Sequence, residues 1–177
     1  LILNKKYNPL FESDARYFII TGGRGSGKSY AATVFLTLLT MTKGIRILFT
    51  RFTMTSAHLS IIPEFLEKIS LLGFDEVFSI NKAEVLNTSN NSDILFRGIK
   101  TSAGNQTASL KSLQGISTWV LDEAEELIDE DIFDTIDLSI REKNIQNRVV
   151  LILNPVTKEH WIYKRFFEDK GVEGGFN

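Results

Sequence analysis

The 177-residue sequence contains no cysteine, which excludes disulfide bonds, thiolate metal sites and cysteine nucleophiles. It also has no apolar run near the ~18 residues that a membrane-spanning helix needs. Lys5 and Lys6 are not followed by an apolar stretch, so the first residues do not have the pattern of a signal peptide. We therefore expect an intracellular protein with no membrane partner.

A large charge of one sign is absent as well, because 20 basic and 22 acidic residues give a net charge of −2. This balance argues against a surface that coats nucleic acid. Ten of the acids lie between Asp122 and Glu142, against Arg141 alone, which leaves 12 acids and 19 bases elsewhere. A mildly basic body of net charge +7 is compatible with a polyanionic partner, although an ordinary mixed surface fits the same charges.

Short apolar strands alternate with amphipathic helices along the chain. This alternation predicts an α/β fold, a mostly parallel sheet flanked by helices. A hairpin is predicted within residues 77–97. Pro63 is expected near the first turn of the helix that ends at Gly73. The predicted strands are 17–21, 45–50, 77–80, 84–88, 93–97, 118–121 and 148–153; the helices are 28–42, from Ser56 or Ser60 to Gly73, 130–140 and 159–167; residues 101–112 are predicted to be a polar surface loop.

The strongest motif is residues 22–29, which match G-x-x-x-x-G-K-[ST] between a strand and a helix. Glycines allow the backbone N–H groups to point at phosphate oxygens, and the helix N-terminus adds a positive dipole end. Lys28 is expected to reach the β- and γ-phosphates and Ser29 to ligate Mg²⁺. The alternative is a glycine-rich turn without a ligand, against which the flanking elements argue. The expected nucleotide-binding residues are Gly22, Gly23, Arg24, Gly25, Ser26, Gly27, Lys28, Ser29 and Tyr30.

A second motif ends the strand at 118–121 with Asp122 and Glu123. In a protein with a phosphate-binding loop, an aspartate at this strand end holds Mg²⁺ through the water shell of the metal ion. The adjacent glutamate polarises the attacking water. Alone the pattern is weak, because a strand that ends in an acidic helix cap has the same letters. Glu125 and Glu126 are expected to be solvated charges.

A third motif ends the strand at 148–153 with Asn154 and Pro155. A polar side chain at the carboxyl end of a central strand lies in the crevice where such sheets bind ligands. Asn154 is therefore a candidate contact for the γ-phosphate or the attacking water. The alternative is a simple strand terminator.

These motifs, in this order, resemble the large subunit of the terminase of tailed bacteriophages, the DNA-packaging motor. The resemblance covers residues 17–167 and includes Arg51, Phe96-Arg97-Gly98, Lys111-Ser112, Trp119 to Ala124, Ile140-Arg141, Asn154-Pro155, His160-Trp161 and Phe166-Phe167. The family often has Glu-Glu where this chain has Asp122-Glu123, and either acid can serve the metal.

The resemblance implies a P-loop NTPase of the additional-strand, conserved-glutamate (RecA-like) type, with a strand inserted between those that carry the loop and Asp122. It also implies a C-terminal RNase H-like nuclease domain, which these residues do not contain. Residues 1–177 are therefore expected to be a single ATPase domain, the N-terminal half of a longer protein, without nuclease activity.

The implied function is Mg²⁺-dependent ATP hydrolysis that drives double-stranded DNA into a procapsid, in the cytoplasm of the infected bacterial host. The implied partners are DNA, the portal protein, the small terminase subunit and neighbouring subunits in a homo-oligomeric ring, although the isolated domain is expected to be monomeric. The resemblance implies that Arg24 contacts the γ-phosphate, and the alternative is a solvated arginine at the tip of the loop. Arg97 is the candidate for an arginine finger that inserts into the site of a neighbouring subunit, with Arg51 and Arg141 as alternatives. For these three arginines the other interpretation is a structural ion pair. Arg16, Tyr17 and Phe11 are weak candidates for adenine binding.

Three other functions use the same loop: a nucleoside or nucleotide kinase, another RecA-like nucleic-acid motor, and a nucleotide-gated binding module without turnover. Kinases usually have a lid with several basic residues, but Lys111 is the single basic residue in the segment 101–112. Glu123 argues against a module without turnover. ATP hydrolysis is therefore the expected activity.

Overall fold

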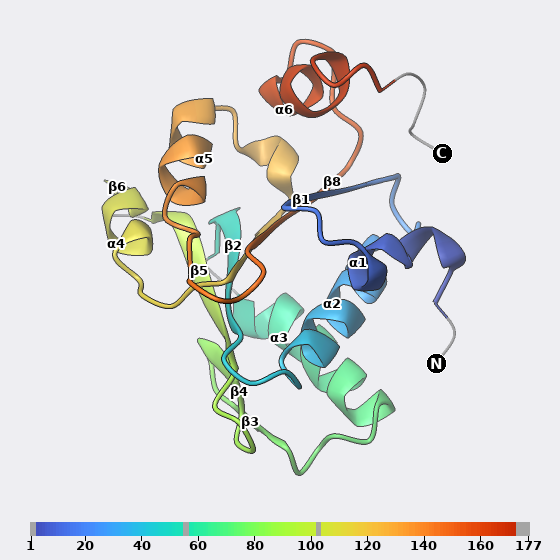
Figure 1. Ribbon diagram of the computed structural model, residues 1–177, viewed down its shortest axis with the longest axis vertical. Helices are drawn as coiled ribbons and strands as arrows, with labels where there is room; N and C mark the ends of the chain where they lie inside the picture. The colour runs from blue at the N-terminus through green and yellow to red at the C-terminus, as the bar shows by residue number, and fades with distance from the viewer. Residues whose placement is uncertain (1–2, 55–56, 102–103, 173–177) are drawn as a thin grey trace.

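The computed structural model describes residues 3–54, 57–101 and 104–172 of the chain. One β-sheet runs through this part of the protein, with helices on both of its faces (Figure 1). Its strands are β1 (Tyr17–Thr21), β2 (Arg46–Thr53), β3 (Phe78–Ile80), β4 (Glu84–Asn87), β5 (Asp93–Thr101), β6 (Gly104–Asn105), β7 (Thr118–Asp122) and β8 (Arg148–Leu153). The predicted α/β class is confirmed.

The strands follow the order β1-β8-β7-β2-β5-β4-β3. From β1 to β5 all neighbours pair in parallel, whereas β4 runs antiparallel to β3 and β5, as the predicted hairpin requires. The short β6 pairs with the end of β5. β8 lies between β1, which precedes the glycine-rich loop, and β7, which ends in Asp122. The inserted strand that the resemblance implied is therefore present.

The helices form two layers, one on each face of the sheet. Buried residues of α2 and α3 belong to one apolar cluster, and those of α4, α5 and α6 belong to a second. Among the described residues, no helix combines the length and apolar character that crossing a bilayer requires. The helices are η1 (Lys5–Tyr7), α1 (Pro9–Glu12), α2 (Lys28–Leu39), α3 (Ala57–Leu71), α4 (Thr107–Lys111), η2 (Ala124–Glu126), α5 (Glu130–Asp137), α6 (Trp161–Tyr163) and η3 (Lys164–Glu168).

The central strands are buried on both sides, which explains their continuous apolar sequences. All five residues of β7 are buried. Because successive side chains of a strand point to opposite faces, Val120 packs in the cluster of α2 and α3, while Trp119 and Leu121 pack in the cluster of α5 and α6. The Trp119 indole N–H also donates to the Thr50 hydroxyl at 2.9 Å, which satisfies its buried polar group.

Two local predictions are wrong. Pro63 lies inside α3 rather than in its first turn, since the helix begins at Ala57; Ser56, one of the two expected caps, lies outside the described residues. The proline leaves one carbonyl without its helical partner, but burial of Ile62, Phe65 and Ile69 keeps the helix continuous. The predicted loop at 101–112 contains β6 and α4, because Leu110 is buried in the second cluster and fixes a helical turn there.

The helix ends also differ from the prediction. α5 ends at Asp137 rather than at residue 140. The last helix begins at Trp161 and continues as the π-type turn η3 to Glu168. After α5 the apolar spacing continues to the buried Ile140, so there the sequence pattern marks buried positions rather than the helix end. The last helix begins two residues later than predicted because His160 caps it.

Phe65 tests how much the layer of α2 and α3 contributes to stability. Its ring is fully buried against Phe49 and Phe96 in edge-on contacts. We expect Phe65→Ala to lower the free energy of unfolding by about 3–5 kcal/mol, because it leaves a cavity in the core. The neighbouring Leu66 is 46% exposed, so Leu66→Ala is the matched control, with a change within about 0.5 kcal/mol. Equal effects in urea denaturation would contradict this packing.

Candidate active site

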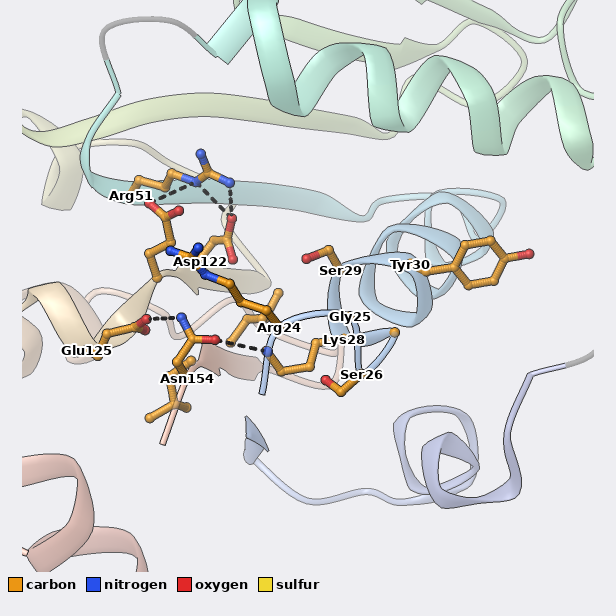
Figure 2. A pocket seen from close by; sticks show the side chains of 14 residues that line it. Arg24, Gly25, Ser26, Lys28, Ser29, Tyr30, Arg51, Asp122, Glu125 and Asn154 are labelled. Carbon is orange, nitrogen blue, oxygen red and sulfur yellow. Dashed lines mark hydrogen bonds and ion pairs between the residues drawn. The ribbon is translucent and has the colours of Figure 1, made fainter. Parts of the chain in front are cut away.

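The glycine-rich segment, residues 22–29, forms the turn after β1 and the first residues of α2, and most of it lines a cavity at this edge of the sheet (Figure 2). Gly25 and Gly27 have φ angles of +74° and +82°, which residues with a side chain rarely adopt. At Gly22, an added Cβ would lie 2.9 Å from the Ser26 Oγ. Glycine at these positions therefore allows the backbone to curl tightly before the helix begins.

Lys28 is the first residue of α2, and its ammonium group lies inside this curl. Nζ donates to the carbonyl oxygens of Gly22 and Gly23, the latter at 3.0 Å, and to Oδ1 of Asn154 at 3.3 Å. Asn154 follows β8, the strand beside β1, so two neighbouring strand ends meet at Lys28. An ammonium group held here is suited to phosphate oxygens, because charge-assisted hydrogen bonds are short and strong.

Asp122, the last residue of β7, is buried and is bound by Arg51 from β2. The Arg51 Nε and one terminal nitrogen donate to the same carboxylate oxygen, Oδ2, at 2.8 Å and 2.6 Å. The Nε also lies 3.6 Å from Oε2 of Glu123. One arginine therefore holds both carboxylates at the end of β7, and it offsets the cost of burying the Asp122 charge.

Glu123 has an unusual backbone, with φ of +53° and ψ of +43°. The left-handed conformation costs a residue with a side chain about 1–2 kcal/mol and turns the chain sharply out of β7. Burial raises the pKa of the Glu123 carboxyl, the Arg51 charge lowers it in part, and the Asp122 charge raises it again. The pKa lies above the ordinary value, so the carboxylate is a stronger base than an exposed glutamate.

Asn154 makes a second contact on the far side of its amide. Its Nδ2 donates to Oε1 of Glu125 at 2.6 Å. The prediction that Glu125 is a solvated charge is therefore wrong, because the turn after Glu123 directs this side chain at β8. Glu126, by contrast, is exposed as expected.

These side chains surround a single cavity of about 440 Å³, which is in the size range of small-molecule sites. It combines the phosphate-binding segment with the ends of β2, β7 and β8. The lining residues are Arg24, Gly25, Ser26, Gly27, Lys28, Ser29, Tyr30, Arg51, Asp122, Glu123, Glu125, Ile152, Leu153 and Asn154. Of the predicted nucleotide-binding residues, only Gly22 and Gly23 are not in the lining, and they bind Lys28 through their carbonyl groups.

Three cations and three carboxylates are among the lining side chains, so the formal charge of the cavity is zero. Ser29 and Asp122 supply the hydroxyl and carboxylate oxygens that Mg²⁺ prefers. Both hydrogen bonds from Arg51 to Asp122 go to the carboxylate oxygen Oδ2 and none to Oδ1. Within the described part of the chain, no group of three acidic or histidine side chains is arranged to hold a metal. A divalent ion here would therefore need further ligands from water and from phosphate.

The other predicted residues occupy different places. Arg24 lines the cavity, and in Figure 2 its side chain extends from the loop toward the carboxylates at the end of β7. Tyr30 also lines the cavity, but its ring points away from Asp122 and packs under the Lys68 ammonium, 4.7 Å from the ring centre. Arg97 is not in the lining, and it donates to the carbonyl oxygens of Phe96 and Ala83.

Sequence reasoning missed the local roles of Tyr7 and Glu125, and it named no partner for Arg51. The Tyr7 hydroxyl donates to the Ser26 carbonyl oxygen at 3.1 Å and so braces the loop from the N-terminal segment. Arg51, considered above as a finger for a neighbour or as a structural ion-pair partner, binds Asp122 of its own chain, 71 residues away. Such pairs become visible only when the strand order is known.

The residues considered for adenine binding have other partners. Arg16 pairs with the Asp137 carboxylate at 2.7 Å, and the Tyr17 hydroxyl donates to the same carboxylate. Phe11 packs edge-on against Phe35. Tyr17 also lines a second cavity, of about 370 Å³, with Tyr7.

The pair of Arg51 and Asp122 has a measurable effect on stability. Arg51→Ala leaves a buried carboxylate without its cation, so we expect the free energy of unfolding to fall by about 1.5–3 kcal/mol. Asp122→Asn added to this variant should recover part of the loss, because a neutral amide needs no cation. Arg141 is exposed, so Arg141→Ala is the control, with a change within about 0.5 kcal/mol. Chemical denaturation that gives equal losses for both arginines would contradict the pairing.

Solved structures of similar fold come from phage packaging proteins. The large terminase of a thermophilic bacteriophage matches with a TM-score of 0.73 at 13% identity, covering 96% of this chain and 43% of that chain. The same terminase in complex with ATP-gamma-S gives 0.69 at 13% identity, with 96% and 42% coverage. The ATPase domain of the Thermus phage P74-26 large terminase gives 0.67 at 18% identity, with 92% and 68% coverage. The bacteriophage Phi-29 viral genome packaging motor assembly gives 0.64 at 16% identity, with 94% and 51% coverage.

At these identities the likeness establishes the fold, and the chain spans less than half the length of the first of these relatives. No curated protein matches the sequence. The family model of the phage terminase large subunit matches residues 14–174, which include β1, the glycine-rich loop, β7 and Asn154. The chain belongs to the phage terminase large subunit family.

Proposed function

We propose that this chain hydrolyses ATP in a Mg²⁺-dependent reaction and that the hydrolysis drives double-stranded DNA into a viral procapsid. The observation that carries the proposal is the position of Glu123, beside Asp122 and in the same cavity as Lys28. The likeness in fold to a terminase in complex with ATP-gamma-S and to a packaging motor assembly supports it.

Each part of the cavity has a separate task in this proposal. The backbone N–H groups of the loop and the Lys28 ammonium bind the phosphate oxygens, and the N-terminus of α2 adds its dipole. Ser29 and Asp122 would hold Mg²⁺, which neutralises phosphate charge when it is bound. The positive charge of Mg²⁺ is needed, because a cavity with a formal charge of zero cannot balance the negative charge of a triphosphate.

Glu123 is the proposed general base. Its raised pKa makes it a better proton acceptor, and Arg51 limits the orientations of its carboxylate through the contact at 3.6 Å. Arg24 and Asn154 lie at the same cavity and are proposed to contact the γ-phosphate end of the nucleotide. A kinase needs no base beside Asp122 and needs an acceptor pocket, so hydrolysis accounts for this arrangement better.

The wider context follows from family membership and is also part of the proposal. The chain would act as the ATPase domain of a longer protein, in a homo-oligomeric ring with the portal protein, the small terminase subunit and DNA, in the host cytoplasm. With a net charge of −2, the isolated domain should bind DNA weakly and with a steep dependence on salt. Alone it should be a monomer with low ATPase activity and no nuclease activity.

Two substitutions separate binding from hydrolysis. Glu123→Gln should bind Mg-ATP with nearly unchanged affinity but lose hydrolysis, because an amide cannot accept a proton from water. Lys28→Ala should lose hydrolysis and bind ATP more weakly, because it removes a charge-assisted phosphate contact worth about 1.5–3 kcal/mol. Binding of a fluorescent ATP analogue and release of phosphate measure the two properties. Wild-type hydrolysis by Glu123→Gln would refute the general base.

Protein concentration tests whether a neighbour completes the site. If Arg97 is donated to the next subunit, specific ATPase activity should rise with protein concentration, since an arginine supplied in trans can accelerate hydrolysis by about 10³–10⁵-fold. Arg97→Ala should remove that rise and leave ATP binding unchanged, with Arg24→Ala as the comparison for an arginine acting within the chain. A fast rate that does not depend on concentration would eliminate this role of Arg97.

A further inference from the structure

Glu125 holds two segments that are far from it in sequence. Its Oε1 accepts a hydrogen bond from Asn154 Nδ2 at 2.6 Å, and its backbone carbonyl oxygen lies 3.2 Å from His160 Nε2. His160 in turn caps α6, since its Nδ1 accepts from the N–H of Ile162. The segment that joins β8 to α6 is therefore attached to Glu125 at both of its ends.

The contact with Glu125 fixes which way the Asn154 amide faces. An ionised carboxylate only accepts hydrogen bonds, so the NH₂ group of Asn154 must turn toward Glu125. The amide oxygen then faces the Lys28 ammonium, from which it accepts at 3.3 Å. In the reversed orientation, oxygen would face oxygen and the NH₂ group would face a cation, so both contacts would be repulsive. Figure 2 shows the three side chains in this row.

Stability alone does not account for a glutamate at this position. The second oxygen of Glu125, Oε2, is buried and has no hydrogen-bond partner in the described structure. A buried acceptor without a partner usually costs about 1–3 kcal/mol. We expect a protein to keep a side chain with this cost where one of its contacts serves the function. For Glu125 that contact is the hydrogen bond with Asn154 in the lining of the cavity.

We propose that Glu125 is a positioning residue for ATP hydrolysis, which acts by fixing the amide of Asn154 with its oxygen toward Lys28. The inference rests on the proposed function. Glu125 does not contact phosphate in this account; it acts through Asn154, and so its loss and the loss of Asn154 should have the same effect. The contacts that Arg51 makes with Asp122, at the other side of the cavity, are not involved.

A double-mutant cycle in ATPase activity tests this. Glu125→Ala should lower kcat about 10–100-fold, as for other residues that orient a site residue, with KM for ATP within about threefold of wild type. Asn154→Ala should lower kcat equally, and the double variant should be no slower than either single variant. Glu125→Gln keeps an acceptor oxygen and should retain most of the activity. Glu126→Ala, which changes the exposed neighbour, is the control and should match wild type.

Three results would overturn the proposal: kcat losses that multiply in the double variant, a rise in KM with kcat unchanged, or wild-type activity in Glu125→Ala. Urea denaturation of the same variants keeps the test independent of the proposed function. The two single substitutions should shift the midpoint by amounts that are not additive in the double variant. If wild type hydrolyses no ATP, the proposed function fails, whereas additive midpoint shifts would overturn the contact itself.

Discussion

The parallel pairing of β1, β8, β7 and β2 is the constraint on which the candidate site depends. Parallel neighbours end at the same edge of a sheet, so the loop after β1, Asn154 after β8, Asp122 at the end of β7 and Arg51 on β2 are brought together. The helices on both faces bury these strands and hold their order. Packing far from the cavity, such as that of Trp119 and Val120 on opposite faces of β7, thereby sets the positions of the charged groups.

Charge balance is the second organising feature of the site. Lys28 and Arg51 lie on opposite sides of the cavity, and each is held by acceptors of its own chain: loop carbonyls and Asn154 for Lys28, and the two carboxylates at the end of β7 for Arg51. Glu123 and Glu125 belong to the same turn but point to different partners. The left-handed backbone of Glu123 makes that divergence possible, at a local energetic cost.

The sequence was sufficient to predict the α/β class, the strands other than β6 and the glycine-rich loop, because these depend on local apolar runs and on glycine. It was also sufficient to select the residues at the ends of β1, β7 and β8 that line the cavity. It could not predict the partner of Arg51, which depends on the pairing of β2 with β7, or the contact of Glu125 with Asn154, which depends on the sharp turn at Glu123. Pro63 was misplaced for a related reason, since tertiary burial of α3 outweighs the local preference of proline.

The central claim is that water, positioned by the cavity, is the acceptor of the γ-phosphoryl group. The most direct measurement is a single turnover of Mg-ATP in water enriched in ¹⁸O, with no other acceptor present, followed by mass analysis of the released phosphate. The account predicts stoichiometric release of phosphate that carries one oxygen from water, and no such release by the Glu123→Gln variant. Nucleotide binding without release, or release only when an added hydroxyl acceptor is phosphorylated, would contradict it.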